Sequence, residues 1–356
     1  MVRKSTKLRT IREIIKVYNK KTEPKLRKWL NGSAEYGFTT SRNNKIFRSI
    51  GIIPRVLREI DASNSESNFF GVKTSSPFLI APMGGISQFN KKAEHIISEG
   101  AEKMKIPYFF PNNSSYLLSE MNPNLKKKYL FRSLYLDANL DYCKKNIEEA
   151  EKYKCKAIAI TVDSPIRPVS YNKTDTGHDA RKHYKKFGLK RPKKNPNFTA
   201  PLDWKIIEYI KKISDTPIIL KGILSKEDAK IAESLNIEGI WISNHGGRNL
   251  ETDITSIEVI EEIKNILTKK TKLILDGGIR TGTDMFKTLA LGADFVAIGR
   301  PIIYALTADR KIGVDRILEL LSHEFKSTMR ICGCKNIDDI NSNYIVNRLK
   351  NAKDIF

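Results

Sequence analysis

Residues 272–300, KLILDGGIRTGTDMFKTLALGADFVAIGR, decide the fold class. The stretch begins with an apolar run at 272–278, continues with an amphipathic segment at 283–292, and ends with a second apolar run at 295–300. Short apolar runs that end in glycine or a polar residue are typical of strands buried on both faces of a parallel sheet. The stretch therefore predicts a strand, a helix and a second strand parallel to the first.

The same alternation extends through the chain from residue 77 onward. Helix signals at 225–235 and 255–267 each follow a strand candidate, and Thr255 and Glu258 have the spacing of a capping box. Eight strands that alternate with helices predict an α/β protein, a (β/α)8 TIM barrel with a short helical N-terminal extension. The other six strand candidates are 77–82 (PFLIAP), 106–111 (IPYFFP), 129–135 (YLFRSLY), 156–163 (KAIAITVD), 217–222 (PIILKG) and 239–244 (GIWISN).

The composition of the 356 residues is that of a globular protein, with 40% apolar and 29% charged residues. No apolar run approaches the roughly 18 residues that a membrane-spanning helix needs, and the basic N-terminus lacks the features of a secretory signal. We therefore expect a cytoplasmic protein. The four cysteines have no disulfide-framework spacing and are interpreted as reduced thiols; for Cys332 and Cys334 we favour a structural role over metal binding.

The net charge of +23 is concentrated in two stretches, residues 1–28 and 173–194. Neither stretch interleaves basic residues with aromatic stacking positions, as nucleic-acid binding would favour. A solvated basic face is the preferred interpretation, and contact with an anionic surface, an acidic partner or nucleic acid is the alternative.

Polar residues and glycines gather at the predicted carboxyl ends of the strands, where TIM barrels place their chemistry. Residues 276–280 (DGGIR) and 299–300 (GR) combine glycines with arginines and predict a phosphate site. Arg248 suits a bidentate grip on a carboxylate, and His245 suits proton abstraction near neutral pH. The full set at this rim is Tyr135, Thr161, Asp163, Lys221, His245, Arg248, Asp276, Arg280, Gly299 and Arg300.

Residues 243–248 (SNHGGR), 275–280 (LDGGIR) and 298–301 (IGRP) resemble the FMN-dependent 2-hydroxy acid oxidase/dehydrogenase family, which includes glycolate and lactate oxidases. The similarity runs from about residue 24 to residue 345. It implies FMN-dependent oxidation of an L-2-hydroxy acid to the 2-oxo acid. We expect a basic extension (1–28), an FMN-binding barrel (29–345) with a basic variable loop over the active site (171–200), and a C-terminal tail (346–356).

The resemblance also implies how FMN is held. The phosphate would lie at residues 278–280 and 299–300, and Lys221 would lie near the pyrimidine edge of the flavin, where its charge stabilises the reduced ring. The residues that the resemblance places at the cofactor are Pro82, Met83, Gly84, Ser133, Thr161, Lys221, Ser243, Asp276, Gly278, Arg280, Gly299 and Arg300.

The same resemblance assigns roles around the substrate. His245 would take the proton from the hydroxyl as hydride passes to the flavin, or the α-proton in a carbanion mechanism. Asp163 would orient His245 and stabilise its protonated form. Arg248 would hold the substrate carboxylate, with Tyr135 near the hydroxyl and Trp29 beside the carboxylate. These residues, with Lys221, form the expected catalytic and substrate-binding set.

Three departures from the family pattern concern the substrate and the flavin surroundings. Trp29 stands where a tyrosine is usual, Ser133 where a glutamine is usual and Met83 where a threonine is common. They weaken a prediction of a small substrate such as lactate, and a bulky or peptide-derived hydroxy or amino acid is the alternative.

Two further alternatives and three partner questions follow from the sequence. An enzyme like type 2 isopentenyl diphosphate isomerase, another FMN barrel, is suggested by residues 81–85 (APMGG), and the chain could instead be a non-catalytic flavin-binding module. The electron acceptor is open between oxygen, a quinone and a separate protein. The resemblance implies a homotetramer, and the basic segments suggest contact with an anionic surface.

Overall fold

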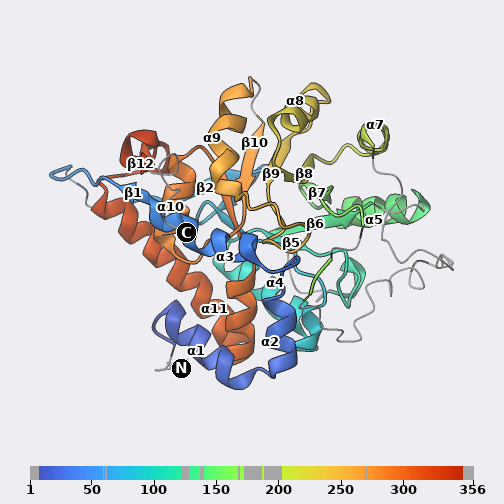
Figure 1. The fold of residues 1–356 in the computed structure, drawn as a ribbon. Coiled ribbons are helices and arrows are strands. Elements are labelled where there is room, and N and C mark those ends of the chain that lie inside the picture. Colours follow the sequence, from blue (N-terminus) through green and yellow to red (C-terminus); the bar gives the residue numbers. More distant parts are fainter. Residues whose placement is uncertain are drawn as a thin grey trace.

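Eight parallel strands form a closed barrel in the computed structural model, which describes residues 8–58, 60, 62–121, 128–136, 140–166, 169–171, 187, 203–268 and 271–347 (Figure 1). Around the barrel the order is β10-β11-β4-β5-β6-β7-β8-β9, which closes the sheet through a β9–β10 pair. All eight predicted strands are confirmed. They are β4 (Phe78–Ile80), β5 (Tyr108–Phe110), β6 (Leu130–Tyr135), β7 (Ile158–Thr161), β8 (Ile218–Ile223), β9 (Gly239–Ile242), β10 (Lys272–Leu275) and β11 (Phe295–Ile298).

Large side chains fill the barrel interior, because alternate residues of each strand point inward. Phe109, Phe131, Trp241 and Phe295 belong to this interior cluster. A hairpin of β2 (Ser67–Phe69) and β3 (Val72–Thr74) adds Phe69, whose ring lies 4.6 Å from that of Phe295 and 5.1 Å from that of Phe131. Since Phe295 begins its strand, the hairpin covers the amino ends of the strands and leaves the carboxyl ends for a site.

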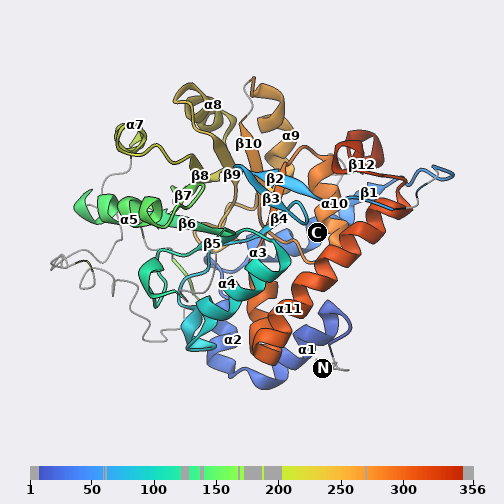
Figure 2. The same ribbon diagram turned by 180° about the vertical axis from the view of Figure 1, so that it is seen from behind.

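Helices surround the barrel, as Figure 2 shows from behind. The helices predicted after the fifth, sixth and seventh strands are confirmed as α8, α9 and α10, and Thr255 and Glu258 form the predicted capping box of α9. The helices around the barrel are α4 (Ala93–Met104), α5 (Leu140–Lys152), α7 (Trp204–Ile213), α8 (Lys226–Ser234), α9 (Ser256–Ile266), α10 (Gly282–Ala290) and α11 (Arg300–Ile331).

Three helices precede the barrel: α1 (Ile11–Lys21), α2 (Pro24–Leu30) and α3 (Phe38–Lys45). Helix α1 lies along α11 in both views and buries Ile11, Ile14 and Tyr18, while its basic residues are exposed (Figures 1 and 2). Of the predicted basic loop, residues 172–186 and 188–200 lie outside the described residues, as do residues 1–7 and 348–356.

The remaining elements are short. Strand β1 (Ile50–Ile52) pairs antiparallel with β12 (Ile345–Asn347). All four cysteines are buried free thiols, and burial raises the pKa of Cys332 to about 11. Among the helices described, none combines the length and the apolar character that crossing a membrane demands. The 3-10 helices are η1 (Ile46–Ser49), η2 (Ile86–Gln88), η3 (Leu118–Glu120), η4 (Ile337–Asp339) and η5 (Ser342–Tyr344).

Candidate active site

A pocket of about 340 Å³ lies at the carboxyl ends of the barrel strands. Both the residues expected around the substrate and those expected around the phosphate line it. The predicted residues in its wall are Trp29, Pro82, Met83, Gly84, Tyr135, Lys221, His245, Arg248, Asp276, Gly278, Arg280, Gly299 and Arg300.

Four predicted site residues do not line the pocket. Asp163 lies behind His245 and bonds to it, and Ser243 lies between Lys221 and Asp276. Ser133 in β6 and Thr161 at the end of β7 are buried in the barrel wall, 1% and 3% exposed. The first two therefore support pocket residues, and the last two have no contact with the pocket in this structure.

Eight lining residues were not among the predicted site residues. Gly246, Gly277 and Ile279 lie inside the motifs that were recognised, so the motifs could have identified them. Asn113 lies in the segment PNNSS (111–115) after the second strand. The sequence does not show which residues of this segment face the site. The others are apolar residues without a chemical signal: Leu30, Ala81, Ile86 and Ala297.

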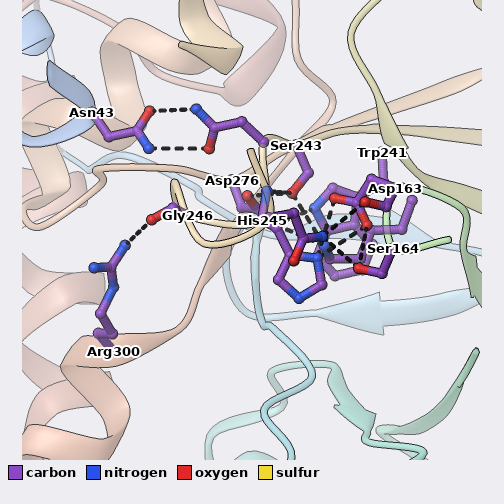
Figure 3. Close-up of polar contacts among 12 residues, drawn as sticks. Asn43, Asp163, Ser164, Trp241, Ser243, His245, Gly246, Asp276 and Arg300 are labelled. Atoms are coloured by element: carbon purple, nitrogen blue, oxygen red, sulfur yellow. Dashed lines mark hydrogen bonds and ion pairs between the residues drawn. The ribbon is translucent and has the colours of Figure 1, made fainter. Parts of the chain in front are cut away.

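His245 is held between a carboxylate and a phenol, as Figure 3 shows in part. Its Nδ1 lies 3.0 and 3.1 Å from the two carboxylate oxygens of Asp163, and its Nε2 lies 3.2 Å from the Tyr135 hydroxyl. With the Nδ1 proton donated to Asp163, the neutral ring presents Nε2 as an acceptor. Burial and the nearby Asp163 raise the pKa of Tyr135, so its hydroxyl stays protonated and can donate to Nε2.

Asp163 remains ionised in this environment. Burial on its own raises the pKa of the carboxyl, but the charges of His245 and Lys221 and the hydrogen bond from His245 outweigh it, and the net pKa is lowered. Asn249 donates from Nδ2 to the backbone carbonyl of Asp163 at 2.9 Å, which fixes the loop that carries the carboxylate. The arrangement provides a base with a fixed anion behind it.

The loop after β9 is positioned by helix α3. Asn43 and Asn244 exchange two amide hydrogen bonds, of 3.0 and 2.9 Å, drawn in Figure 3. Gly247 has φ +75°, and a Cβ there would lie 2.4 Å from the Thr40 hydroxyl oxygen. Close approach of α3 therefore requires glycine at 247, and it places His245, itself at φ 56°, over the pocket.

Lys221, Ser243 and Asp276 form a hydrogen-bonded network below His245. The Ser243 hydroxyl donates to Asp276 Oδ1 at 2.7 Å and accepts from Lys221 Nζ at 3.1 Å and from the His245 backbone N–H at 3.0 Å. Lys221 Nζ lies 3.8 Å from Asp276 Oδ2. The network places the ammonium in the pocket wall and ties it to the backbone of His245.

Arg280 and Arg300 make part of the pocket wall suitable for an anion. Arg300 begins helix α11 and donates from Nη2 to the Gly246 carbonyl at 2.8 Å, and Arg280 donates to the Ile279 carbonyl at 2.9 Å. Among the described residues, neither guanidinium forms an ion pair with a carboxylate. Burial, followed by the charge of Arg300, lowers the pKa of Arg280 to about 10, and burial also lowers the pKa of Arg300.

Arg280 and Arg300 are half-buried cations at helix N-termini without a carboxylate partner among the described residues, so a bound anion stabilises them. Gly278, two residues before Arg280, has φ +84°, and a Cβ there would lie 1.7 Å from the carbonyl oxygen of Asn43, so helix α3 packs closely against this loop only because the residue is glycine. This donor set fits the phosphate of FMN, as the sequence predicts.

Backbone carbonyls at the end of helix α2 accept hydrogen bonds from Arg248. Its Nη1 donates to the carbonyls of Leu30 and Gly32, both at 2.9 Å, and to that of Trp29 at 3.2 Å, while its guanidinium lies 5.7 Å from the Trp29 ring centre. Burial, and then the charge of Arg300, lowers the pKa of Arg248 to about 10. Within the described part of the chain its Nε has no acceptor, so one edge of the fork is free for a ligand carboxylate.

Known proteins match the chain over most of its length. A model of the family "FMN-dependent dehydrogenase" matches residues 18–347. A peroxisomal (S)-2-hydroxyacid oxidase (GLO3) from Arabidopsis thaliana is 34% identical, with 88% of this chain and 90% of that protein covered. The 2-hydroxyacid oxidase 2 of Homo sapiens is 32% identical, with 90% and 93% covered.

A bacterial relative and a solved structure also match most of the chain. An L-lactate dehydrogenase from Acinetobacter baumannii is 29% identical over 92% of this chain and 94% of that protein. A crystal structure of mandelate oxidase with (S)-2-phenylpropionate superposes with a TM-score of 0.83 at 28% identity, and 95% of this chain and 97% of that chain are covered. The chain belongs to the FMN-dependent dehydrogenase family, as the resemblance in its motifs predicts.

Proposed function

We propose that this flavoprotein oxidises an L-2-hydroxy acid to the 2-oxo acid, with His245 as the base. The observation that carries the proposal is the His245–Asp163 pair, because His245 lines the pocket with Tyr135 and Arg248 and its Nε2 accepts from the Tyr135 hydroxyl. A base, a hydrogen-bond donor and a cation at one end of a pocket suit a substrate with adjacent hydroxyl and carboxylate groups.

The residues act in a definite order on such a substrate. The free edge of Arg248 binds the carboxylate, and the Tyr135 hydroxyl donates to the substrate hydroxyl oxygen. His245 Nε2 then takes a proton, either from the hydroxyl or from the α-carbon, and Asp163 stabilises the imidazolium that forms. The α-carbon loses two electrons, its C–O bond becomes a carbonyl, and the second proton leaves with the hydride or from the hydroxyl.

FMN, when bound, supplies the acceptor for the two electrons. Its phosphate would be held by Arg280, Arg300 and the backbone at Gly278 and Gly299, and Lys221 would stabilise negative charge in the pocket. The cytoplasmic location and a homotetrameric state stay predictions from the sequence, and the sequence leaves the electron acceptor open between oxygen, a quinone and a separate protein.

The substrate side chain is proposed to be bulky and apolar. Trp29, Leu30, Met83 and Ile86 contribute apolar side chains to the pocket wall, and the Trp29 ring packs 5.9 Å from that of Phe89. Such a wall favours an aromatic or branched side chain over the hydrogen atom of glycolate.

An anaerobic absorbance titration tests the proposal. The purified protein receives 2-hydroxy acids from glycolate and lactate to mandelate, phenyllactate and long-chain members. Bleaching of the flavin band by at least one of them, with the L enantiomer preferred, is expected, and fastest bleaching by bulky members supports the apolar wall. A flavin band that no member bleaches would contradict the proposal and favour a peptide-derived substrate, isomerase chemistry or a non-catalytic module.

A further inference from the structure

We propose that Trp241, in the barrel interior, is a positioning residue that keeps the Lys221 ammonium directed at the cofactor pocket by holding the Asp276 carboxylate. The inference rests on the proposed function in so far as the pocket binds FMN. Trp241 does not line the pocket and takes no part in the proton transfer described above.

Trp241 is fully buried on β9, in register with Lys221 on β8 and Ile274 on β10. Its ring packs edge-on against Phe109 at 5.1 Å, inside a cluster of phenyl and aliphatic side chains. An indole N–H buried in such surroundings requires an acceptor, because losing its water without a replacement costs free energy. The Nε1 group donates to Asp276 Oδ2 at 2.9 Å, a contact drawn in Figure 3.

Both oxygens of Asp276 are therefore held by neutral donors. Oδ1 accepts from the Ser243 hydroxyl at 2.7 Å and Oδ2 accepts from Trp241. Lys221 Nζ lies 3.8 Å from Oδ2, beyond hydrogen-bond distance, and donates to Ser243 Oγ at 3.1 Å instead. The carboxylate is close enough to stabilise the ammonium without forming a direct hydrogen bond to it.

The indole also lies beside the ammonium, with Lys221 Nζ 5.7 Å from its ring centre. Removal of the indole N–H would leave Oδ2 without its donor, and Lys221 is the cation paired with this carboxylate in the described part of the chain. A direct Lys221–Asp276 hydrogen bond would then form, since an ion pair strengthens steeply at short distance in a buried site. The ammonium would turn toward Asp276, and its charge would stabilise an anion in the pocket less well.

Trp241→Phe tests this, with Trp204→Phe in helix α7 as the matched control away from the pocket. The two-electron reduction potential of bound FMN and the dissociation constant for sulfite, an anion that adds to flavins, are measured. Trp241→Phe is expected to weaken sulfite binding about tenfold and to lower the potential by about 30 mV, the equivalent of a tenfold change for two electrons. Trp204→Phe is expected to change neither.

A second comparison separates positioning from simple packing. On an Asp276→Asn background, Trp241→Phe should no longer change either quantity, because the carboxylate that the indole holds is absent. The same shift on both backgrounds would overturn the proposal, as would normal FMN binding with unchanged potential and sulfite affinity in Trp241→Phe.

If Trp241→Phe does not fold, benzothienylalanine at this position keeps the ring shape and removes only the N–H group. The shifts expected of Trp241→Phe are then expected of this variant, and their absence overturns the proposal. The readouts use a chemical reductant and sulfite, so they are obtained whether or not a 2-hydroxy acid reduces the wild type. A failure of the proposed function can therefore be distinguished from a failure of the Trp241 proposal.

Discussion

Gly222 leaves the space that the Asp163 carboxylate occupies: a Cβ on Gly222 would lie 2.4 Å from the Cβ of Asp163 and 2.5 Å from its Cγ. Gly222 also has φ +112°, which L side chains rarely adopt. The close approach of β8 to the loop after β7 thus sets the position of the carboxylate behind His245.

Gly222→Ala should therefore displace Asp163 and strain the backbone. We expect flavin reduction to slow by about 100-fold and the free energy of unfolding to fall by about 2–4 kcal/mol. Gly71→Ala is the control, since Gly71 has φ +79° but a Cβ there would meet no heavy atom within 4 Å. Denaturant unfolding and stopped-flow absorbance measure both variants; equal effects in the two would show that strain alone is responsible.

Asp163→Asn should leave the fold and FMN binding intact but slow flavin reduction by about 10³-fold or more. The amide removes the charge that stabilises the His245 imidazolium and can present an N–H to Nδ1 in place of an acceptor. Asp203→Asn, at the N-cap of helix α7 and outside the pocket wall, is the matched control and should leave the reduction rate unchanged. A reduction rate within about threefold of wild type in Asp163→Asn would show that the carboxylate is not needed.

Arg248→Lys keeps a positive charge but loses the planar fork that binds the α2 carbonyls on one edge and a carboxylate on the other. The dissociation constant for oxalate, a carboxylate analogue of the product, should rise by about 100-fold. Arg42→Lys, at an ion pair outside the pocket, should leave it unchanged. Unaltered oxalate affinity in Arg248→Lys would show that Arg248 does not bind the ligand carboxylate.

Glu258 links helix α9 to helix α3. It accepts from Arg42 Nη2 at 2.6 Å and from the Thr255 N–H and hydroxyl, both at 2.9 Å. Burial on its own raises the pKa of Glu258, but the bonds from Arg42 and Thr255 lower it overall. A carboxyl with a depressed pKa stabilises the folded state above its unfolded pKa, and this stability is lost as the pH falls through the folded pKa.

Glu258→Gln should therefore cost about 1–2 kcal/mol at pH 7, and the difference from wild type should shrink below about pH 4. Urea unfolding of both proteins at the two pH values measures this. A stability difference that stays constant with pH would mean that the charge of Glu258 contributes nothing.

The sequence predicts the barrel well because a strand buried on both faces must be continuously apolar, as in 240–242 and 273–275. The rim residues follow from the strand ends, and all of the catalytic set except Asp163 lines the pocket. Side-chain contacts between neighbouring strands cannot be predicted from the sequence, because they depend on strand register and on side-chain direction. The Trp241–Asp276 bond and the clasp of Arg248 by α2 carbonyls carry no sequence signal, and neither do Leu30 and Ile86 in the pocket wall.

His245→Ala tests whether His245 is the base. Single-turnover reduction of the bound flavin by the best 2-hydroxy acid is followed anaerobically, with His323→Ala, at an exposed position in α11, as the control. We expect that His245→Ala stays yellow and that its flavin is reduced about 10³-fold more slowly or not at all, while His323→Ala behaves as wild type. Reduction of the His245→Ala flavin at the wild-type rate would contradict this role of His245.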